Sequence, residues 1–420
     1  MAGEVNMTTT LSRDVVAAID QPQALYVLME MLPNQMMANV SMPLNFSLVL
    51  DKSGSMAVDG KIQSLKEAVA EVIKMLGPSD TISIITFDTS TKALVESQSV
   101  RDDRDRNSIW NKVRGINADG GTAMAPAMRK GIDLVRRKFS PAAVNQIVLL
   151  TDGQTEGEDA CKREAQAAAQ AQIPILALGL GADWNTDLLV GLASVSGGQA
   201  EYLQSAAEIV PYFKNAVSTM QASIVRNAAL TLRLVNGVEP RRVWRVVPQI
   251  SDLGRAPLSD RSIFVPLGDL DKQDGQAILV DLLLHPRPQG SYRVAQAELS
   301  YDVPLLNLTG QRLLADLMLH VTADPVLAQR VNPRVMNVAE RVQAFKLQTR
   351  ALDEARAGNV LAATQILKTV HTMLLDQGEL EKARTVRLEA DQLEQSGKMS
   401  EEGARTIQFK SGKTRRLDQP

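Results

Sequence analysis

Cysteine, histidine and aromatic residues are scarce in this chain of 420 residues. The single cysteine, Cys161, excludes an intramolecular disulfide framework, and a thiolate metal cluster needs more than one cysteine. The three histidines (His285, His320 and His371) lie far apart in the sequence, which disfavours a histidine-rich zinc site. Aromatic residues make up only 4%, so Leu, Val, Ile, Ala and Met must fill the interior.

Excess charge and long apolar runs are also missing. The formal net charge is -2, which indicates neither a nucleic acid nor an anionic membrane as partner. No apolar run approaches the roughly 20 residues of a membrane span. The polar start, 1–13, has no apolar core typical of a signal peptide, so we expect a cytoplasmic protein. The hydrophobic fraction of 45% is sufficient for buried cores, and the length predicts two or three domains.

Strands and helices alternate between residues 44 and 220. Short apolar runs of the kind found in strands buried on both faces are separated by segments with helical spacing of apolar residues. The strands are expected at Asn45–Leu50, Thr81–Phe87, Gln146–Leu150 and Ile173–Leu180, and the helices at Lys61–Leu76, Ala123–Phe139 and Glu158–Gln172. This alternation predicts a Rossmann-like, doubly wound α/β domain with its ligands at the carboxyl ends of the strands.

The segments on either side have a different pattern. Residues 222–322 contain strand-like runs separated by Gly, Pro, Asp and Asn, with no helix between them, which predicts an antiparallel β-sandwich. Two more strand-like runs lie within 8–40 and have no place in the α/β domain. We therefore expect residues 8–40 and 222–322 to form one sandwich, with the α/β domain of residues 44–220 inserted into it.

The last part of the chain is predicted to be helical. Residues 326–396 have apolar positions at helical spacing, broken at Gly358 and Gly378, which indicates packed helical hairpins. Residues 397–420 are expected to be a flexible basic tail. Because hydroxyls lie within this basic sequence, Thr406 or Thr414 is a candidate phosphorylation site for a phosphothreonine reader.

Oxygen-bearing side chains follow two of the buried strands. Asp51, Ser53 and Ser55 form a D-x-S-x-S pattern directly after the first strand, Thr122 precedes a helix, and Asp152 follows the strand QIVLL. Carboxylates and hydroxyls are hard oxygen ligands that suit Mg²⁺, and also Mn²⁺ or Ca²⁺. Two carboxylates and three hydroxyls satisfy Mg²⁺ only in part, which leaves a coordination position for a carboxylate from outside.

This constellation resembles the metal-ion-dependent adhesion site of the von Willebrand factor type A domain. The motifs that carry the resemblance are NFSLVLD, DKSGSM, GGT and IVLLTDG, within about residues 44–220. The resemblance implies that Ser53, Ser55 and Thr122 contact the metal, and that Asp51 and Asp152 bind it directly or through water. It also implies that a partner protein supplies an Asp or Glu as the last ligand. The loops around Gly54, Gly121 and Gly153 would then face that partner.

The resemblance also extends to the flanking strands. A domain of this kind inserted in a sandwich, with the run ending in ELSYDVP, is similar to bacterial proteins related to calcium-activated-channel-like and inter-alpha-trypsin-inhibitor-heavy-chain-like proteins. The preferred interpretation is a non-catalytic adaptor or scaffold that uses Mg²⁺ to capture an acidic residue of a partner.

Other functions stay open at this stage. The chain has no nucleotide-binding loop of its own, which is compatible with a subunit that delivers targets to a partner AAA+ ATPase, as in MoxR-like or magnesium-chelatase-like systems. A metal-dependent hydrolase is a remote alternative. A dehalogenase-type phosphatase needs a second carboxylate where Ser53 stands, and a serine nucleophile needs a base although the first histidine is His285.

Overall fold

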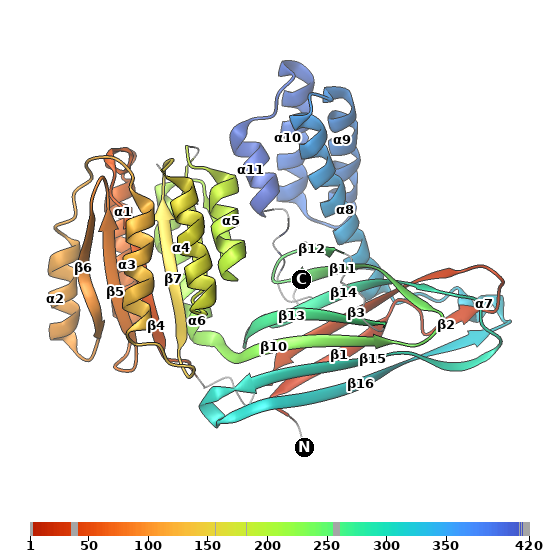
Figure 1. The fold of residues 1–420 in the computed structure, drawn as a ribbon. Helices are drawn as coiled ribbons and strands as arrows, with labels where there is room; N and C mark the ends of the chain where they lie inside the picture. Colours follow the sequence, from red (N-terminus) through yellow and green to blue (C-terminus); the bar gives the residue numbers. More distant parts are fainter. Residues whose placement is uncertain are drawn as a thin grey trace. The chain divides into compact units, whose positions relative to one another are not determined.

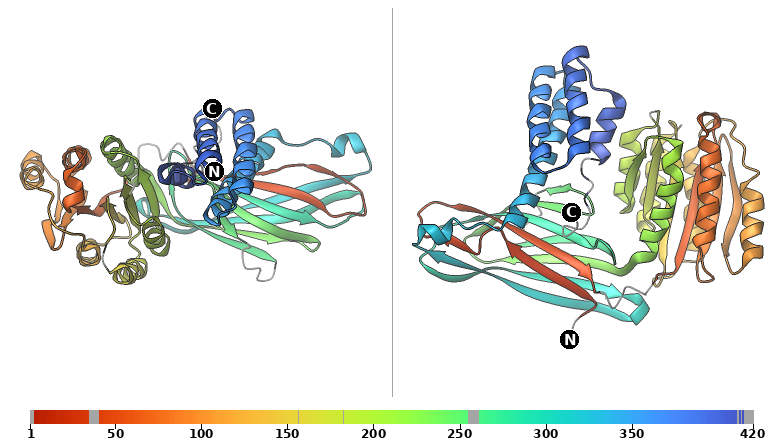
Figure 2. Two further views of the ribbon diagram at one scale, coloured as in Figure 1. Left: turned by 90° about the horizontal axis from the view of Figure 1, so that it is seen from above. Right: turned by 180° about the vertical axis from the view of Figure 1, so that it is seen from behind.

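The computed structural model describes residues 3–34, 41–155, 157–181, 183–254, 261–410, 412 and 414. Two compact units divide the chain between them. One unit is the continuous segment Ser41–Ala222, here called the inserted unit, and the other combines Met1–Val40 with Ser223–Pro420. The inserted unit thus interrupts the chain of the other unit once. Figures 1 and 2 show the elements of each.

The inserted unit has a six-stranded sheet in the order β6-β5-β4-β7-β8-β9. All neighbouring strands are parallel except β5 and β6, because β6 lies antiparallel at one edge. Helices cover both faces, with α1 and α6 packed together behind the sheet in Figure 1 and α3 and α4 in front of it. The elements are β4 (Leu44–Asp51), α1 (Lys61–Met75), β5 (Thr81–Phe87), β6 (Thr91–Ser99), α2 (Asp103–Val113), α3 (Met124–Arg136), β7 (Val144–Thr151), α4 (Glu158–Gln170), β8 (Ile175–Leu180), α5 (Thr186–Ser196), β9 (Gln199–Leu203) and α6 (Ile209–Ala222).

The centre of this sheet is apolar because its strands are covered on both sides. Every residue of β4 and β8 is buried, and in β5 every residue except Thr81 is buried. Side chains of successive strand residues point to opposite faces, so a strand of this kind needs apolar residues on both. The predicted doubly wound α/β domain is confirmed. Its parallel strands β4 and β7 end side by side, at Asp51 and Thr151.

The other unit contains two five-stranded sheets, ordered β1-β3-β14-β11-β12 and β13-β10-β15-β16-β2. Pairing within them is antiparallel, apart from the short parallel pair of β2 and β16. Contacts of β1 with β16 and of β3 with β13 join the sheets, and the Tyr301 hydroxyl donates to the Glu4 carboxylate across them (3.1 Å). The strands are β1 (Val5–Leu11), β2 (Val15–Ala17), β3 (Gln23–Pro33), β10 (Ser223–Leu234), β11 (Val238–Val247), β12 (Ser251–Gly254), β13 (Ser262–Asp271), β14 (Gln276–Leu284), β15 (Gly290–Val303) and β16 (Leu308–Thr322).

A helical region follows the second sheet, as predicted. It consists of α7 (Pro325–Ala328), α8 (Pro333–Arg356), α9 (Val360–Asp376), α10 (Leu380–Ser396) and α11 (Glu401–Lys410). Helices α8, α9 and α10 are connected by turns in which Gly358 and Gly378 have positive φ angles, a conformation that glycine adopts without a steric penalty. The first turns of α8 pack on the sheet through Val335 and Val338, which join a buried cluster with Trp244.

The prediction of a flexible tail over residues 397–420 is wrong for Glu401–Lys410, which form α11. Ile407 is only 2% exposed and belongs to the same buried cluster as Leu393 of α10. Further along, the Gly412 carbonyl accepts a hydrogen bond from the Ile250 backbone (2.7 Å). The many charged residues of this segment obscure the few apolar positions that anchor it. Most of the remaining tail lies outside the described residues.

Candidate functional site

The first part of the site is the turn that follows β4. Asp51, the last residue of the strand, is fully buried, and its carboxylate accepts a hydrogen bond from the Ser53 backbone N–H (2.8 Å). The 3₁₀ turn η2 (Gly54–Ala57) comes next, and Met56 anchors it because its side chain is fully buried. This short, anchored turn brings Ser53 and Ser55 to the same end of the sheet as Asp51.

Four of the five predicted side chains belong to one hydrogen-bonded network with Thr151. The hydroxyls of Ser53 and Ser55 are 3.0 Å apart, and the Ser55 hydroxyl donates to Asp152 Oδ1 (2.6 Å). The Thr151 hydroxyl donates to Asp51 Oδ2 (2.6 Å) and so connects the ends of β7 and β4. Asp152 is 1% exposed. Thr151 is not among the site residues predicted from the sequence, although it directly precedes Asp152.

Backbone contacts place the loop that contains Thr122 beside this turn. The Gly54 N–H donates to the Gly120 carbonyl (3.0 Å), and the Asp119 N–H donates to the Lys52 carbonyl (2.8 Å). Gly120 has a positive φ of 79°, and a Cβ there would lie 2.8 Å from Thr89 Oγ1, so glycine is required at this position.

Thr122 itself is half-buried, and its carbonyl accepts a hydrogen bond from the Thr155 hydroxyl (2.8 Å). The contacts that fix Thr122 therefore run through its backbone. Its neighbour Gly121 is exposed. On the Asp152 side, a Cβ on Gly153 would lie 3.7 Å from Ser55 Oγ, so the third predicted loop is also adjacent to the network.

A lysine that the sequence analysis did not single out also contacts the site. Lys61, the first residue of α1, places its Nζ 2.7 Å from Asp152 Oδ2. The Lys61 side chain is 13% exposed and that of Asp152 is fully buried. No spacing rule links Lys61 to the motif, because the contact depends on where α1 begins relative to β7. Lys52, inside the motif, pairs instead with Asp88 and lowers the pKa of that carboxyl to about 2.

The electrostatics of the network favour a cation. Burial is the main cause that raises the pKa of Asp51, and the nearby carboxylate of Asp152 adds to it. Hydrogen bonds from Thr151 and Ser53 oppose that rise. Two buried carboxylates surrounded by hydroxyl oxygens are a donor set that hard divalent cations accept. Within the described ranges, no group of three or more His, Cys, Asp or Glu residues could hold a metal, so a metal here would depend on the hydroxyls.

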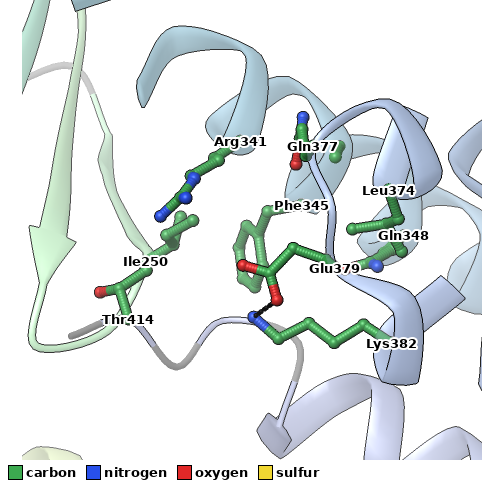
Figure 3. Close-up of a pocket in the computed structure, with 10 residues that line it drawn as sticks. Ile250, Arg341, Phe345, Gln348, Leu374, Gln377, Glu379, Lys382 and Thr414 are labelled. Atoms are coloured by element: carbon green, nitrogen blue, oxygen red, sulfur yellow. Dashed lines mark ion pairs between the residues drawn. The ribbon is translucent and has the colours of Figure 1, made fainter. Parts of the chain in front are cut away.

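Described residues of the other unit line at least two cavities. The first has about 20 Å³, is shown in Figure 3, and contains the ion pair of Glu379 and Lys382 (3.5 Å) beside Phe345. That volume admits about one water molecule and no substrate. The second, of about 190 Å³, contains the Arg334–Glu30 ion pair (2.7 Å). Neither brings together side chains with recognisable chemistry of the kind found at the end of β4.

Two known families match separate parts of the chain. Residues 44–202 match the von Willebrand factor type A domain family. Residues 333–420 match the family described as the Sll0103-like, C-terminal alpha-helical domain.

Among individual proteins, the uncharacterized protein sll0103 of Synechocystis is 28% identical over 340 residues, which are 78% of each chain. The human inter-alpha-trypsin inhibitor heavy chain H4 is also 28% identical, over 44% of this chain. That alignment spans only 21% of the human protein's own length.

Solved structures resemble the fold over nearly the whole chain. The von Willebrand factor type A protein from Catenulispora acidiphila aligns with a TM-score of 0.77 and 20% identity, covering 98% of this chain and 97% of that one. The ArnB paralog VWA2 from Sulfolobus acidocaldarius aligns with a TM-score of 0.52 and 16% identity, covering 96% and 98%. At these identities the likeness concerns the fold. Of the helices formed by described residues, none is long and apolar enough to cross a membrane.

Proposed function

The chain contains a domain of the von Willebrand factor type A family, as its motifs predicted, and from this premise we propose a non-catalytic protein-interaction function that depends on a divalent metal. In this proposal Mg²⁺ is held at the end of β4 and captures an acidic side chain of a partner protein. Domains of this family often mediate interactions between proteins, and the chemistry described above is what such a role requires.

The observation that carries the proposal is the network of oxygen donors. Asp51, Ser53, Ser55 and Asp152 come from two separate stretches of sequence and lie within consecutive hydrogen bonds of 2.6–3.0 Å. The two carboxylates are buried, and buried carboxylates need a cation or a proton nearby. The donor set fits Mg²⁺ and Mn²⁺, and Ca²⁺ in a less regular geometry.

Each residue would have a limited task. Ser53 and Ser55 would supply neutral oxygen ligands, Asp51 and Asp152 would supply negative charge, and the loop with Thr122 would complete the set. When bound, the metal would act as a Lewis-acidic centre for a carboxylate. Attraction between the metal and that carboxylate is stronger where the protein interface excludes water.

A non-catalytic role agrees with the surroundings of the two serines. The Ser53 hydroxyl contacts Ser55, and the Ser55 hydroxyl donates to Asp152, a carboxylate that Lys61 also contacts. Activation of a serine as a nucleophile needs a base that is available to take its proton. The described residues of the inserted unit include no histidine, and Asp152 is already engaged by two donors.

The experiment that tests this function measures metal binding and metal-dependent capture. We expect isothermal titration calorimetry to detect one Mg²⁺ or Mn²⁺ per chain in the wild type and none in Asp51→Ala. Ser53→Ala removes one hydroxyl only and should weaken binding without disturbing the fold. Asp133→Asn, an exposed position on α3, is the matched control and should bind like the wild type.

Capture is tested by passing a cell lysate with Mg²⁺ over resins that carry the wild type, Asp51→Ala or Asp133→Asn. Proteins eluted from the wild type by EDTA should be absent from the Asp51→Ala resin and present on the Asp133→Asn resin. Metal binding that survives in Asp51→Ala, or capture that EDTA does not reverse, would contradict the proposed function.

A further inference from the structure

Lys61 is in an unusual position for a cation. It is the first residue of α1, whose first turn contains no acidic residue, and the N-terminus of a helix carries partial positive charge. A lysine there gains nothing from the helix. Gly60 before it has a positive φ of 70° and turns the chain into the helix at this point. The positive charge of Lys61 is instead compensated by the Asp152 carboxylate, whose Oδ2 lies 2.7 Å from Lys61 Nζ.

The contact places Lys61 inside the donor network. Asp152 Oδ1 accepts a hydrogen bond from the Ser55 hydroxyl, and Asp152 Oδ2 accepts one from Lys61 Nζ. One oxygen of the carboxylate thus contacts the hydroxyl network and the other contacts the lysine. Because the Asp152 side chain is fully buried and that of Lys61 is 13% exposed, solvent screens this pair weakly.

The charges of the site can be counted from these residues. Asp51 and Asp152 contribute two negative charges and Lys61 contributes one positive charge, so the site has a net charge of -1. Adding a divalent cation gives +1. Without Lys61 the same cation would give a neutral site. With Lys61 present, the metal-loaded site therefore has one surplus positive charge. The negative charge of one carboxylate would neutralise it.

We propose that Lys61 is an internal cation that weakens metal binding and makes the metal and an acidic ligand bind cooperatively. This inference rests on the proposed function of the same site. Lys61 repels the divalent ion and competes with it for Asp152, so the metal alone binds weakly. A carboxylate offsets the surplus charge, so metal and carboxylate each raise the affinity for the other, by the same factor.

A purely structural role for Lys61 makes a different prediction. If the lysine only held Asp152 in place, its removal would disorder a metal ligand and weaken metal binding. If it acts as a competing cation, its removal strengthens metal binding. The sign of the change in metal affinity therefore separates the two roles.

The test uses the full chain, Mn²⁺ as the metal and acetate as the carboxylate probe, with isothermal titration calorimetry as the readout. In Lys61→Met, we expect the affinity for Mn²⁺ without acetate to rise about tenfold or more. In the wild type, saturating acetate should raise the affinity for Mn²⁺ about fivefold or more, and this gain should be much smaller in Lys61→Met.

Two controls keep the result interpretable. Lys61→Arg retains the positive charge and should bind Mn²⁺ like the wild type. Lys66→Met removes the same charge from the same helix, outside the network, and should also behave like the wild type. Lys61→Met leaves Oδ2 of Asp152 without its lysine partner, while Oδ1 keeps the hydrogen bond from Ser55. The melting temperature of this variant without metal should therefore fall, and its rise on adding Mn²⁺ should exceed that of the wild type.

The outcomes separate this inference from the proposed function. If Lys61→Met binds Mn²⁺ as the wild type does, or more weakly, the role of Lys61 is overturned and the proposed function stands. If Lys61→Met binds Mn²⁺ and the wild type does not, the role of Lys61 is supported and the proposed function fails. If neither protein binds Mn²⁺, both are overturned.

Discussion

Replacing Gly131 by alanine is expected to destabilise the inserted unit, although alanine is the better helix former. Gly131 lies in α3, where the helix packs on β4. A Cβ at this position would lie 2.9 Å from Val49 Cγ2 and 3.3 Å from Ser47 Oγ. Val49 is fully buried and β-branched, so it has few alternative rotamers. The clash must therefore move α3 away from the strand that ends at Asp51.

The magnitude follows from two opposing effects. Alanine in place of a helical glycine gains about 1 kcal/mol of helix propensity. Overpacking of a buried contact costs about 1–3 kcal/mol. Gly191 in α5 is a matched control, because a Cβ there meets no atom within 4 Å. Since the propensity gain is common to both variants, their difference in stability should equal the overpacking cost.

Cys161 provides an assay specific to this unit. It is the chain's only cysteine, it is fully buried in α4, and burial is the main cause that raises its pKa to about 11. A thiol reagent at neutral pH should react with Cys161 only when the inserted unit opens, and the reaction rate then follows the unfolding equilibrium. We expect labelling in Gly131→Ala to be roughly 5–150 times faster than in Gly191→Ala. Equal labelling rates in the two variants would refute the packing argument.

Three further predictions concern metal, pH and a buried carboxylate. Mg²⁺ at a hundred times its dissociation constant should stabilise the inserted unit by about 2.7 kcal/mol, and EDTA should reverse the resulting rise in melting temperature in calorimetry. Burial and the hydrogen bond to Glu4 raise the pKa of Tyr301 to about 12, whereas the pKa of tyrosine in the unfolded chain is about 10. The protonated Tyr301 side chain therefore contributes to the free energy of unfolding below pH 10, and this contribution is lost as the pH rises towards 12. Tyr301→Phe should therefore lose less stability than the wild type between pH 10 and 12 in urea unfolding; an equal loss would contradict this. Asp80 is 5% exposed and accepts hydrogen bonds from the N–H groups of Leu44 and Gly77 (both 2.8 Å). Asp80→Ala should therefore lower the free energy of unfolding of the inserted unit by about 3 kcal/mol, measured by Cys161 labelling. An unchanged labelling rate would show that these hydrogen bonds are dispensable.

Burial decided which parts of the fold could be predicted from the sequence. The strands β4, β5, β7 and β8 are covered on both faces and appear in the sequence as short apolar runs. Helix α2 was overlooked because only Ile109 and Val113 of its eleven residues are buried, and its first turns are dominated by charge. Strand β16 is difficult to recognise within the strand-like residues 222–322, because Leu314 and Met318 are exposed on its outer face (63% and 53%) and disturb the alternation of polar and apolar residues.

The site could be predicted where the topology alone brings residues together. Asp51 and Asp152 follow adjacent parallel strands, so their proximity follows from the strand order. Lys61 could not be found in this way, because its contact depends on the point at which α1 begins. The roles of the five predicted side chains in metal binding stay predictions, as do the AAA+ ATPase partner, the phosphothreonine reader and the cytoplasmic location.

The way in which the chain enters and leaves the inserted unit has a practical consequence. The backbone N–H of Met42 donates to the carbonyl of Gln221 (3.0 Å), so the two ends of this unit are neighbours. A segment with adjoining ends can be transplanted as a cassette into a surface loop of an unrelated host, because the host needs to open only by the width of two chains. The inserted unit, with the hydrogen-bonded network at the end of β4, could thus be grafted without the sheets and helices of the other unit.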